Sequence, residues 1–219
     1  MPPAALALLT AGLLVMKDLP QAFLARLGEL EIAPSPRVLV VRVADQTLTL
    51  FENGRPKDAW AVSTAANGLG ERLNSFRTPR GLHRIREKIG AGLPKGAIFD
   101  RRVFKGKVWA PADLPPTPSV AAGKAVEALP LAPDLITSRI LWLEGLEPGK
   151  NAGVNAAGTV VDSHARFIYI HGTNSERLIG KPVSRGCIRM LNAEIIALFD
   201  RVASGDLVWI EEPKARGRR

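Results

Sequence analysis

One cysteine has the neighbours that a reactive thiol requires. Cys187 is the only cysteine among the 219 residues of the chain. Gly186 allows other groups to approach the backbone closely, and Arg185 and Arg189 bring positive charge that lowers a thiol pKa and enriches the thiolate. The sequence therefore predicts a thiolate nucleophile at Cys187, with an inert buried cysteine as the alternative.

A histidine lies sixteen residues before this cysteine, at the end of a short apolar segment, Phe167–Ile170. An imidazole has the pKa of a general base, so His171 is the candidate partner of Cys187. The alternative is that His171 only satisfies a turn carbonyl. His164, His171 and Cys187 have irregular spacing and no evident fourth ligand, so we expect neither a metal site nor a cofactor. His83 is expected to be structural or exposed.

The charge of the chain limits its partners. The net charge is +9 and the isoelectric point about 10.2, which favours polyanionic or carboxylate-bearing partners. The basic residues show no nucleic-acid reading motif and no interleaved aromatic platform, so nucleic acid is not expected. One cysteine excludes an internal disulfide framework, and no specific protein partner is indicated.

The elements that must position these residues are mainly β-strands. Asn53-Gly54 is a strong hairpin signal between two alternating segments, and Asn192 is a candidate cap for a helix that carries Ile195 and Leu198 on one face. Strands are expected in the following segments: 37–43, 47–51, 58–64, 82–87, 98–103, 136–146, 167–170 and 207–210. This pattern predicts a mainly β domain, built as two packed sheets.

Three parts are expected along the chain. Residues 1–36 form an N-terminal helical segment, residues 37–211 the main domain with a proline-rich insertion at about 111–133, and residues 212–219 a basic tail. Residues 1–16 are apolar enough for an export signal, but neither a basic residue before them nor a clear cleavage site after them supports one.

Three sequence segments link the chain to a known family. Ile170-His-Gly-Thr-Asn-Ser175 is followed by Ser184-Arg-Gly-Cys-Ile-Arg-Met190, and Asn74-Ser-Phe-Arg-Thr-Pro-Arg-Gly81 lies earlier in the chain. Together they resemble the signature of the YkuD-type L,D-transpeptidases, over about residues 37–211. The resemblance implies a two-sheet, β-sandwich-like fold with a short helix after the cysteine, and makes residues 37–211 the catalytic domain.

The resemblance also implies a role for each matching residue. Cys187 is then the nucleophile, His171 the general base and acid, and Gly172 the residue whose backbone carbonyl orients the imidazole. Arg189 supports the cysteine loop or binds a substrate carboxylate. Further oxyanion or substrate-binding candidates are the backbone N–H groups of Gly186 and Cys187, and Ser184 and Arg185.

One position departs from the family pattern. Many members have a second histidine directly before the Gly-Cys pair, where this chain has Arg185. A guanidinium stays protonated and is no base, so His171 is the only histidine within the signature. We expect the fixed positive charge to favour the thiolate and to alter substrate preference.

The implied activity is acyl transfer on peptidoglycan stem tetrapeptides, part of cell-wall biogenesis and cell shape. Cys187 forms an acyl-thioester that an amine resolves, giving 3→3 cross-links or attaching a lipoprotein lysine or a D-amino acid. With water as acceptor the protein is an L,D-carboxypeptidase or amidase. A non-catalytic wall-binding module is the alternative from another class. The family implies location in the periplasm or cell envelope.

Overall fold

The computed structural model describes residues 18–111 and 134–211. The predicted export signal, the insertion after residue 111 and the basic tail lie outside these residues. Within the described ranges, no helix has the length and apolar character needed to cross a membrane.

Strands dominate the described residues, with two α-helices and one short 3₁₀ helix. In chain order the elements are α2 (Gln21–Glu29), β1 (Arg37–Arg42), β2 (Thr47–Glu52), β3 (Arg55–Ala61), β4 (Gly81–Ile89), β5 (Ala97–Asp100), β6 (Val103–Val108), β7 (Ile136–Gly145), β8 (Tyr169–Thr173), η2 (Glu176–Leu178), β9 (Ile188–Met190), α3 (Asn192–Arg201) and β10 (Leu207–Glu211).

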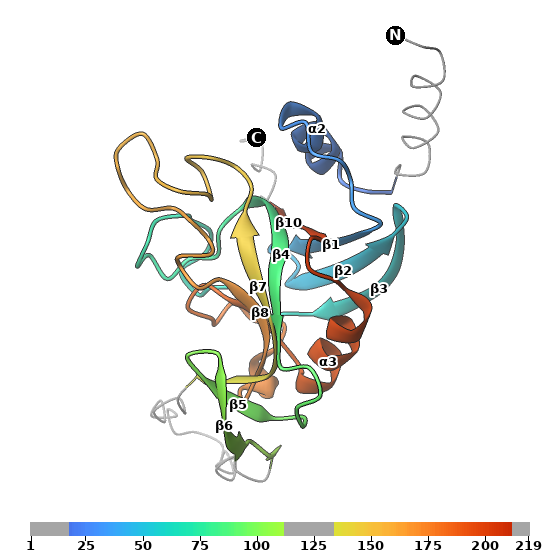
Figure 1. Cartoon of the computed structure of the whole chain (residues 1–219), viewed down its shortest axis with the longest axis vertical. Coiled ribbons are helices and arrows are strands. Elements are labelled where there is room, and N and C mark those ends of the chain that lie inside the picture. The colour runs from blue at the N-terminus through green and yellow to red at the C-terminus, as the bar shows by residue number, and fades with distance from the viewer. Residues whose placement is uncertain (1–17, 112–133, 212–219) are drawn as a thin grey trace, which may run out of the picture.

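Hydrogen bonding joins these strands into one mixed, branched sheet (Figure 1). The main path runs β3-β2-β1-β10-β4-β7-β5-β6. Strand β7 also pairs with β8, and β9 continues beyond β8. The predicted mainly β fold is confirmed, with the helix after the cysteine and a helix in the N-terminal segment. The two predicted sheets are linked through β7, which belongs to both branches.

Each face of the sheet is covered by one helix. Helix α3 packs with one face around the largest core cluster, and its apolar residues Ile195 and Leu198 are fully buried there. Helix α2 covers the other face with Phe23 and Leu27, against Trp209 of β10. Burying both faces accounts for the continuous apolar run of β1 and for the four consecutive buried residues of β2, where Thr49 is buried between Leu48 and Leu50.

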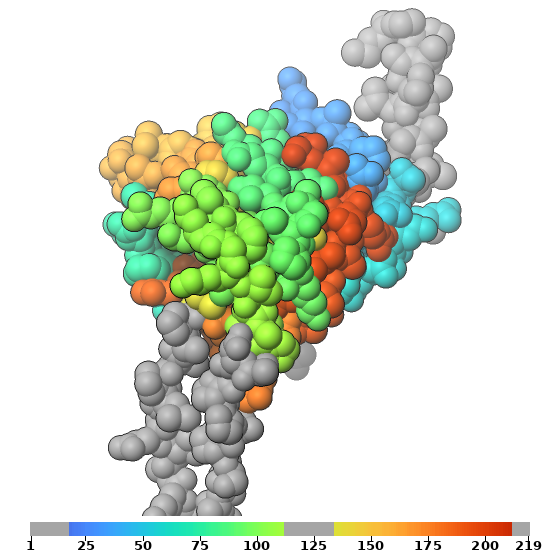
Figure 2. Space-filling model, turned by 60° about the horizontal axis from the view of Figure 1, so that its bottom comes forward, coloured from blue at the N-terminus to red at the C-terminus, as the bar shows by residue number. Residues whose placement is uncertain are grey.

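The β5–β6 hairpin lies beside the branch point of the sheet. It is exposed on the face that Figure 2 brings forward, where the chain is coloured yellow-green. Its residue Phe99 packs with Ile140, Trp142 and Tyr169 in a small separate cluster, against which Cys187 is partly buried. The predicted nucleophile therefore lies at the edge of an apolar cluster.

Candidate active site

Two adjacent parallel strands bring the predicted nucleophile and base together. His171 of β8 pairs with Arg189 of β9, and Cys187 lies two residues before Arg189. Cys187 directly precedes β9, and the charges of Asp134 and Arg189 act on both Cys187 and His171, so the two side chains lie in one neighbourhood. The ring of Tyr169 stands edge-on to the imidazole at 6.5 Å.

The imidazole of His171 is buried and held by its own strand. Its side chain is 1% exposed, and Nδ1 lies 2.7 Å from the carbonyl oxygen of Gly172. This is the contact that the family resemblance implies; its catalytic role stays a prediction. Burial lowers the pKa of His171, against the opposing effects of Asp134 and the Gly172 carbonyl. At neutral pH the ring is therefore neutral, with Nε2 free to accept a proton when Nδ1 donates to Gly172.

The loop before Cys187 is held by hydrogen bonds from the hydroxyl groups of Ser184 and Thr78. The buried hydroxyl of Ser184 donates to the carbonyl of Cys187 at 2.6 Å and accepts from the N–H of Gly186 at 3.2 Å. Thr78, in the predicted Thr-Pro-Arg-Gly motif, donates its hydroxyl to the Gly186 carbonyl at 3.0 Å. The Ser184 hydroxyl is therefore engaged within the loop, and its role in substrate binding stays a prediction. Because the Gly186 N–H is already hydrogen-bonded, the geometry favours the Cys187 N–H as the oxyanion candidate.

The resting thiol is not enriched in thiolate. Burial raises the pKa of Cys187 to about 11, and the charge of Asp134 adds to the rise. The Tyr169 backbone N–H, Arg189 and Arg166 lower the pKa but do not offset burial. The thiol instead donates to the Phe167 carbonyl at 3.3 Å. The expectation that neighbouring positive charge lowers this pKa overall is therefore wrong, because desolvation of the thiolate costs more than these charges return.

An aspartate that the sequence did not indicate completes the site. Asp134 forms an ion pair with the buried guanidinium of Arg189, and its charge acts on both Cys187 and His171. Of the two roles predicted for Arg189, this pairing favours support of the cysteine loop over binding of a substrate carboxylate. Asp134 directly follows the proline-rich segment, and no spacing relative to Cys187 marks it in the sequence.

Arg185, the departure from the family pattern, points to a different neighbour. Its side chain is exposed, and its guanidinium carbon lies 4.9 Å from the ring centroid of Phe76. Arg185 is not among the groups that shift the pKa of Cys187. It therefore belongs to the rim of the site.

The other two histidines have structural surroundings. His164 stacks on Trp142 with 3.9 Å between ring centroids and lies 3.5 Å from the Glu87 carboxylate. His83 is fully buried between the Gly81 carbonyl and the Ser163 hydroxyl. In residues 18–111 and 134–211, no three His, Cys, Asp or Glu side chains gather in a way that could hold a metal ion.

The comparison with known families agrees with this geometry. The model of the YkuD family, the L,D-transpeptidase catalytic domain, matches residues 36–210. Since that match spans most of the sequence, this chain belongs to the YkuD family of L,D-transpeptidase catalytic domains.

Individual relatives match over shorter stretches. The chain is 35% identical over 102 residues to the putative L,D-transpeptidase YqjB of Bacillus subtilis (strain 168), covering 43% of this chain and 58% of the relative. It is 47% identical over 49 residues to the probable L,D-transpeptidase YbiS of Escherichia coli (strain K12), covering 22% and 16%. The chain thus spans less than two thirds of these relatives. An L,D-transpeptidase structure from Mycobacterium smegmatis gives a TM-score of 0.44 at 16% identity, covering 81% of this chain and 59% of that chain.

Proposed function

We propose that this protein is a cysteine-dependent L,D-transpeptidase acting on peptidoglycan stem tetrapeptides. The observation that carries the proposal is the position of Cys187 directly before β9, the strand that pairs with the strand of His171, with Asp134 and Arg189 acting on both side chains and Nδ1 of His171 held by the Gly172 carbonyl. This arrangement leaves Nε2 as the nitrogen that exchanges a proton with the thiol.

The proposed reaction has two half-reactions. The Sγ atom attacks the carbonyl carbon of the third stem residue while its proton passes to Nε2 of His171. The carbon–nitrogen bond to the terminal D-alanine then breaks, and His171 protonates the leaving amine. In the second half-reaction an amine attacks the thioester and gives its proton to His171, which returns it to Sγ. With a second stem as acceptor, the product is a 3→3 cross-link.

The raised pKa of the Cys187 thiol implies that the nucleophile is deprotonated only when substrate is attacked. Because both Cys187 and His171 are neutral at rest, proton transfer accompanies attack on the substrate. A thiol that stays protonated without substrate is also protected from unspecific alkylation and oxidation.

The raised pKa of Cys187 also fits a second candidate function, a non-catalytic module that binds cell-wall polymer through its basic surface. In that case Cys187 is an inert side chain of the small apolar cluster. The two functions are distinguished by turnover of a stem tetrapeptide, which only the enzyme would show.

The test is incubation of the purified protein with disaccharide tetrapeptide, followed by mass spectrometry. We expect a thioester on Cys187 and release of D-alanine, both absent in Cys187→Ala. Cross-linked dimers indicate transpeptidation, and tripeptide alone indicates L,D-carboxypeptidase activity. Full turnover by Cys187→Ala would overturn the mechanism. The module would be favoured if the protein binds cell wall but shows neither turnover nor a carbapenem adduct on Cys187.

The substrate places the protein in the periplasm or cell envelope, as part of the same proposal. Residues 1–16 lie outside the described residues, so N-terminal sequencing of the mature protein from fractionated cells is the test of export.

A further inference from the structure

The arginines of this protein fall into two groups. Within the described residues, a carboxylate lies within ion-pair distance of each arginine in the first group, which comprises Arg26, Arg37, Arg42, Arg80, Arg84, Arg86, Arg189 and Arg201. No such pair involves the other described arginines, which are Arg55, Arg72, Arg77, Arg101, Arg102, Arg139, Arg166, Arg177 and Arg185. Four of these, Arg77, Arg102, Arg166 and Arg185, have contacts near the loop of Cys187.

Each of these four arginines touches the surroundings of the nucleophile. Arg185 is in the cysteine loop itself. The backbone carbonyl oxygen of Arg77 would lie 3.4 Å from a Cβ atom placed on Gly186. Arg166 directly precedes Phe167, whose carbonyl accepts from the thiol. Arg102 reaches over from the β5–β6 hairpin, with its guanidinium carbon 5.1 Å from the Phe167 ring centroid. Positive charge therefore lies near the site, because Arg185 is in the cysteine loop and the charge of Arg166 acts on the Cys187 thiol.

Arg185 is the best placed of the four to bind a ligand. It is exposed, and the ring of Phe76 beneath its guanidinium is 47% exposed. The loops that carry the two side chains are joined by Ala66 N–H to the Ser184 carbonyl at 3.0 Å and by the Thr78–Gly186 bond. A guanidinium stacked on a ring keeps its N–H edge available, and that edge matches a carboxylate bidentately.

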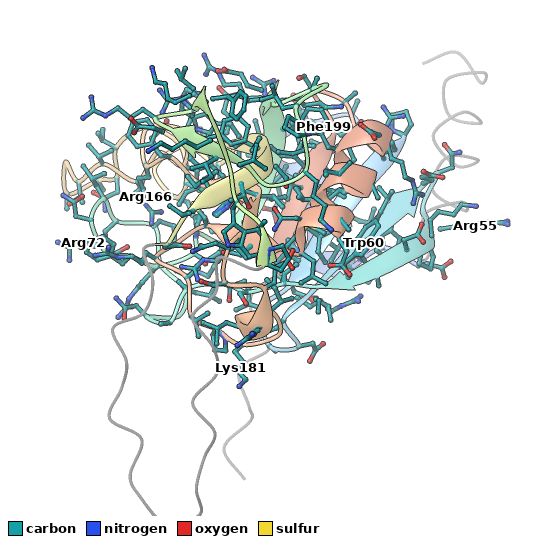
Figure 3. All side chains as sticks on the ribbon, turned by 90° about the horizontal axis from the view of Figure 1, so that it is seen from below. Arg55, Trp60, Arg72, Arg166, Lys181 and Phe199 are labelled. Carbon is teal, nitrogen blue, oxygen red and sulfur yellow. The ribbon has the colours of Figure 1, made fainter. Side chains whose placement is uncertain are left out.

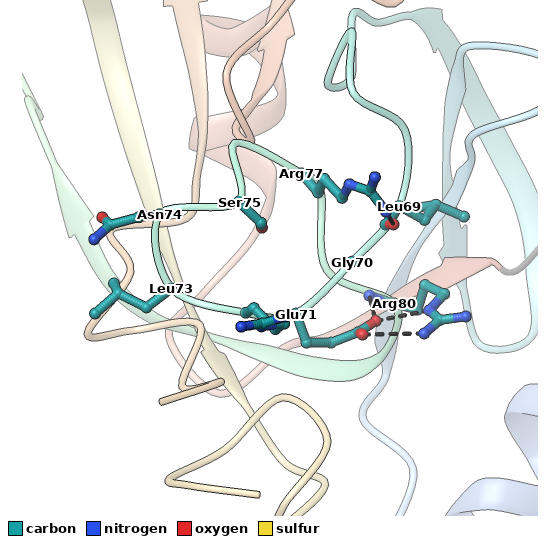
Figure 4. Close-up of a pocket in the computed structure, with 9 residues that line it drawn as sticks. Leu69, Gly70, Glu71, Leu73, Asn74, Ser75, Arg77 and Arg80 are labelled. Atoms are coloured by element: carbon teal, nitrogen blue, oxygen red, sulfur yellow. Dashed lines mark hydrogen bonds and ion pairs between the residues drawn. The ribbon is translucent and has the colours of Figure 1, made fainter. Parts of the chain in front are cut away.

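A hollow of about 580 Å³ opens in the loop of residues 69–80, which also contains Phe76 (Figure 4). It is lined by Ser75 and Arg77, the two neighbours of Phe76 in the chain, together with Arg72 and the Glu71–Arg80 ion pair. The guanidinium of Arg166 fixes this loop by donating to the Arg77 carbonyl at 2.7 Å. The loop that carries Phe76 therefore offers a hollow with charged walls, and it is joined to the cysteine loop by the Thr78–Gly186 bond.

We propose that the stacked Phe76–Arg185 pair is a carboxylate subsite that selects donor stems whose third residue carries a free side-chain carboxylate. The proposal rests on the proposed function. The third residue is the one whose carbonyl Sγ attacks, so its side chain is held nearest to the cysteine loop. Arg189, the other arginine of the motif, is buried and paired with Asp134, which leaves the selection to Arg185.

Binding without turnover tests this subsite directly. In the Cys187→Ala background, calorimetry compares a tetrapeptide whose third residue is diaminopimelate with the same peptide amidated at the side-chain carboxyl. We expect the acid to bind about tenfold more tightly than the amide, as for one charge-assisted bidentate contact. Arg185→Gln should abolish this preference and leave the affinity for the amide within about twofold, since the amide makes no ion pair. Arg185→Lys should keep part of the preference, because charge without a planar fork remains.

The matched control is Arg55→Gln. Arg55 is an exposed arginine of β3 and lies at the opposite side of the molecule from Arg72 and Arg166 (Figure 3). We expect this variant to bind both peptides as the Cys187→Ala protein does. Equal affinity for acid and amide, or equal weakening of both by Arg185→Gln, would overturn the subsite. If the acid preference is present but the intact protein forms no thioester, the subsite stands and the proposed function fails.

Discussion

At the scale of residues, the reactivity of Cys187 is a balance between desolvation and charge. Burial raises its pKa to about 11, and Asp134 acts in the same direction. Arg189, Arg166 and the Tyr169 backbone N–H act in the opposite direction. The motif Arg-Gly-Cys-x-Arg predicts only the charges, because burial is a property of the folded cluster around the sulfur. This is why the direction of the pKa shift predicted from the motif is wrong, while the role of Cys187 as nucleophile stays a prediction.

The first prediction concerns this balance. The rate of Cys187 alkylation by iodoacetamide should rise about tenfold per pH unit from pH 7 to 9 without levelling off, because the thiolate fraction is still growing there. Asp134→Asn removes a negative charge that raises the thiol pKa, so at a given pH it should react about three- to tenfold faster. Asp58→Asn, which changes an exposed residue of β3, is the control and should react as the wild type does. A plateau near pH 8, or slower alkylation of Asp134→Asn, would contradict the assignment.

At the scale of elements, one side chain holds the start of β7, the end of β8 and the start of α3 together. Asn192 was predicted as a helix cap, but the helix begins at Asn192 itself, after Leu191, without a side-chain cap. The fully buried amide accepts from the Thr137 hydroxyl at 2.6 Å and donates to the Thr173 carbonyl at 2.9 Å. It also donates to the Glu176 carboxylate at 2.8 Å. The prediction of a cap is therefore wrong, because the amide joins separate elements.

Asn192→Ala should accordingly destabilise the protein by about 2–4 kcal/mol, because it leaves several buried polar groups without partners. Urea unfolding followed by circular dichroism measures the change. Asn67→Ala is the comparison: Asn67 is exposed and makes one long side-chain bond, 3.3 Å to the Ser75 carbonyl. It should cost less than about 0.5 kcal/mol, as surface substitutions do. Similar losses in the two variants would show that the amide of Asn192 does not connect these elements.

At this scale the sequence predicts contacts between neighbouring segments of the chain, but not the pairing of distant strands. The hairpin turn at Asn53-Gly54 predicts that β2 is followed by an antiparallel partner, because turn and strand signals lie within a few residues. The bounds of that partner are less well predicted: β3 is Arg55–Ala61, three residues earlier than the expected 58–64. The pairing of β1 with β10 joins Val38 to Leu207, at opposite ends of the domain. Nothing in either strand specifies that partner. The same limit hides Asp134, whose neighbour Arg189 lies two strands away.

At the scale of the whole molecule, the two helices seal opposite faces of one sheet. Helix α2 is also held by its charges, since Arg26 pairs with the buried carboxylate of Glu147. Glu147 in turn accepts from the N–H of Leu82 at 2.6 Å, on the strand that carries His83. Glu147 therefore links α2 to the strand that carries His83, so a change of charge at this buried group of polar side chains affects the stability of the whole domain.

The last prediction is the acid sensitivity that His83 gives the fold. Burial lowers its pKa to about 4 in the folded protein, whereas an unfolded histidine titrates near 6.5. Above pH 6.5 neither state binds the proton, and the full stability is present. As the pH falls from 6.5 toward 4, the unfolded state takes up a proton that the folded state refuses, so stability is lost. By pH 5 the loss from this side chain should be about 2 kcal/mol.

Urea unfolding at pH 7 and pH 5 measures that loss. His83→Gln has no imidazole to titrate, so its stability should fall by about 2 kcal/mol less between the two pH values than the wild type. Ser163→Ala is the matched variant, because it removes the hydroxyl 2.9 Å from Nε2 but keeps the imidazole. It should lower stability at both pH values and retain most of the loss on acidification. If His83→Gln loses as much stability as the wild type between pH 7 and pH 5, the buried imidazole is not the acid-sensitive group, and the loss must come from His171 or from the carboxylates.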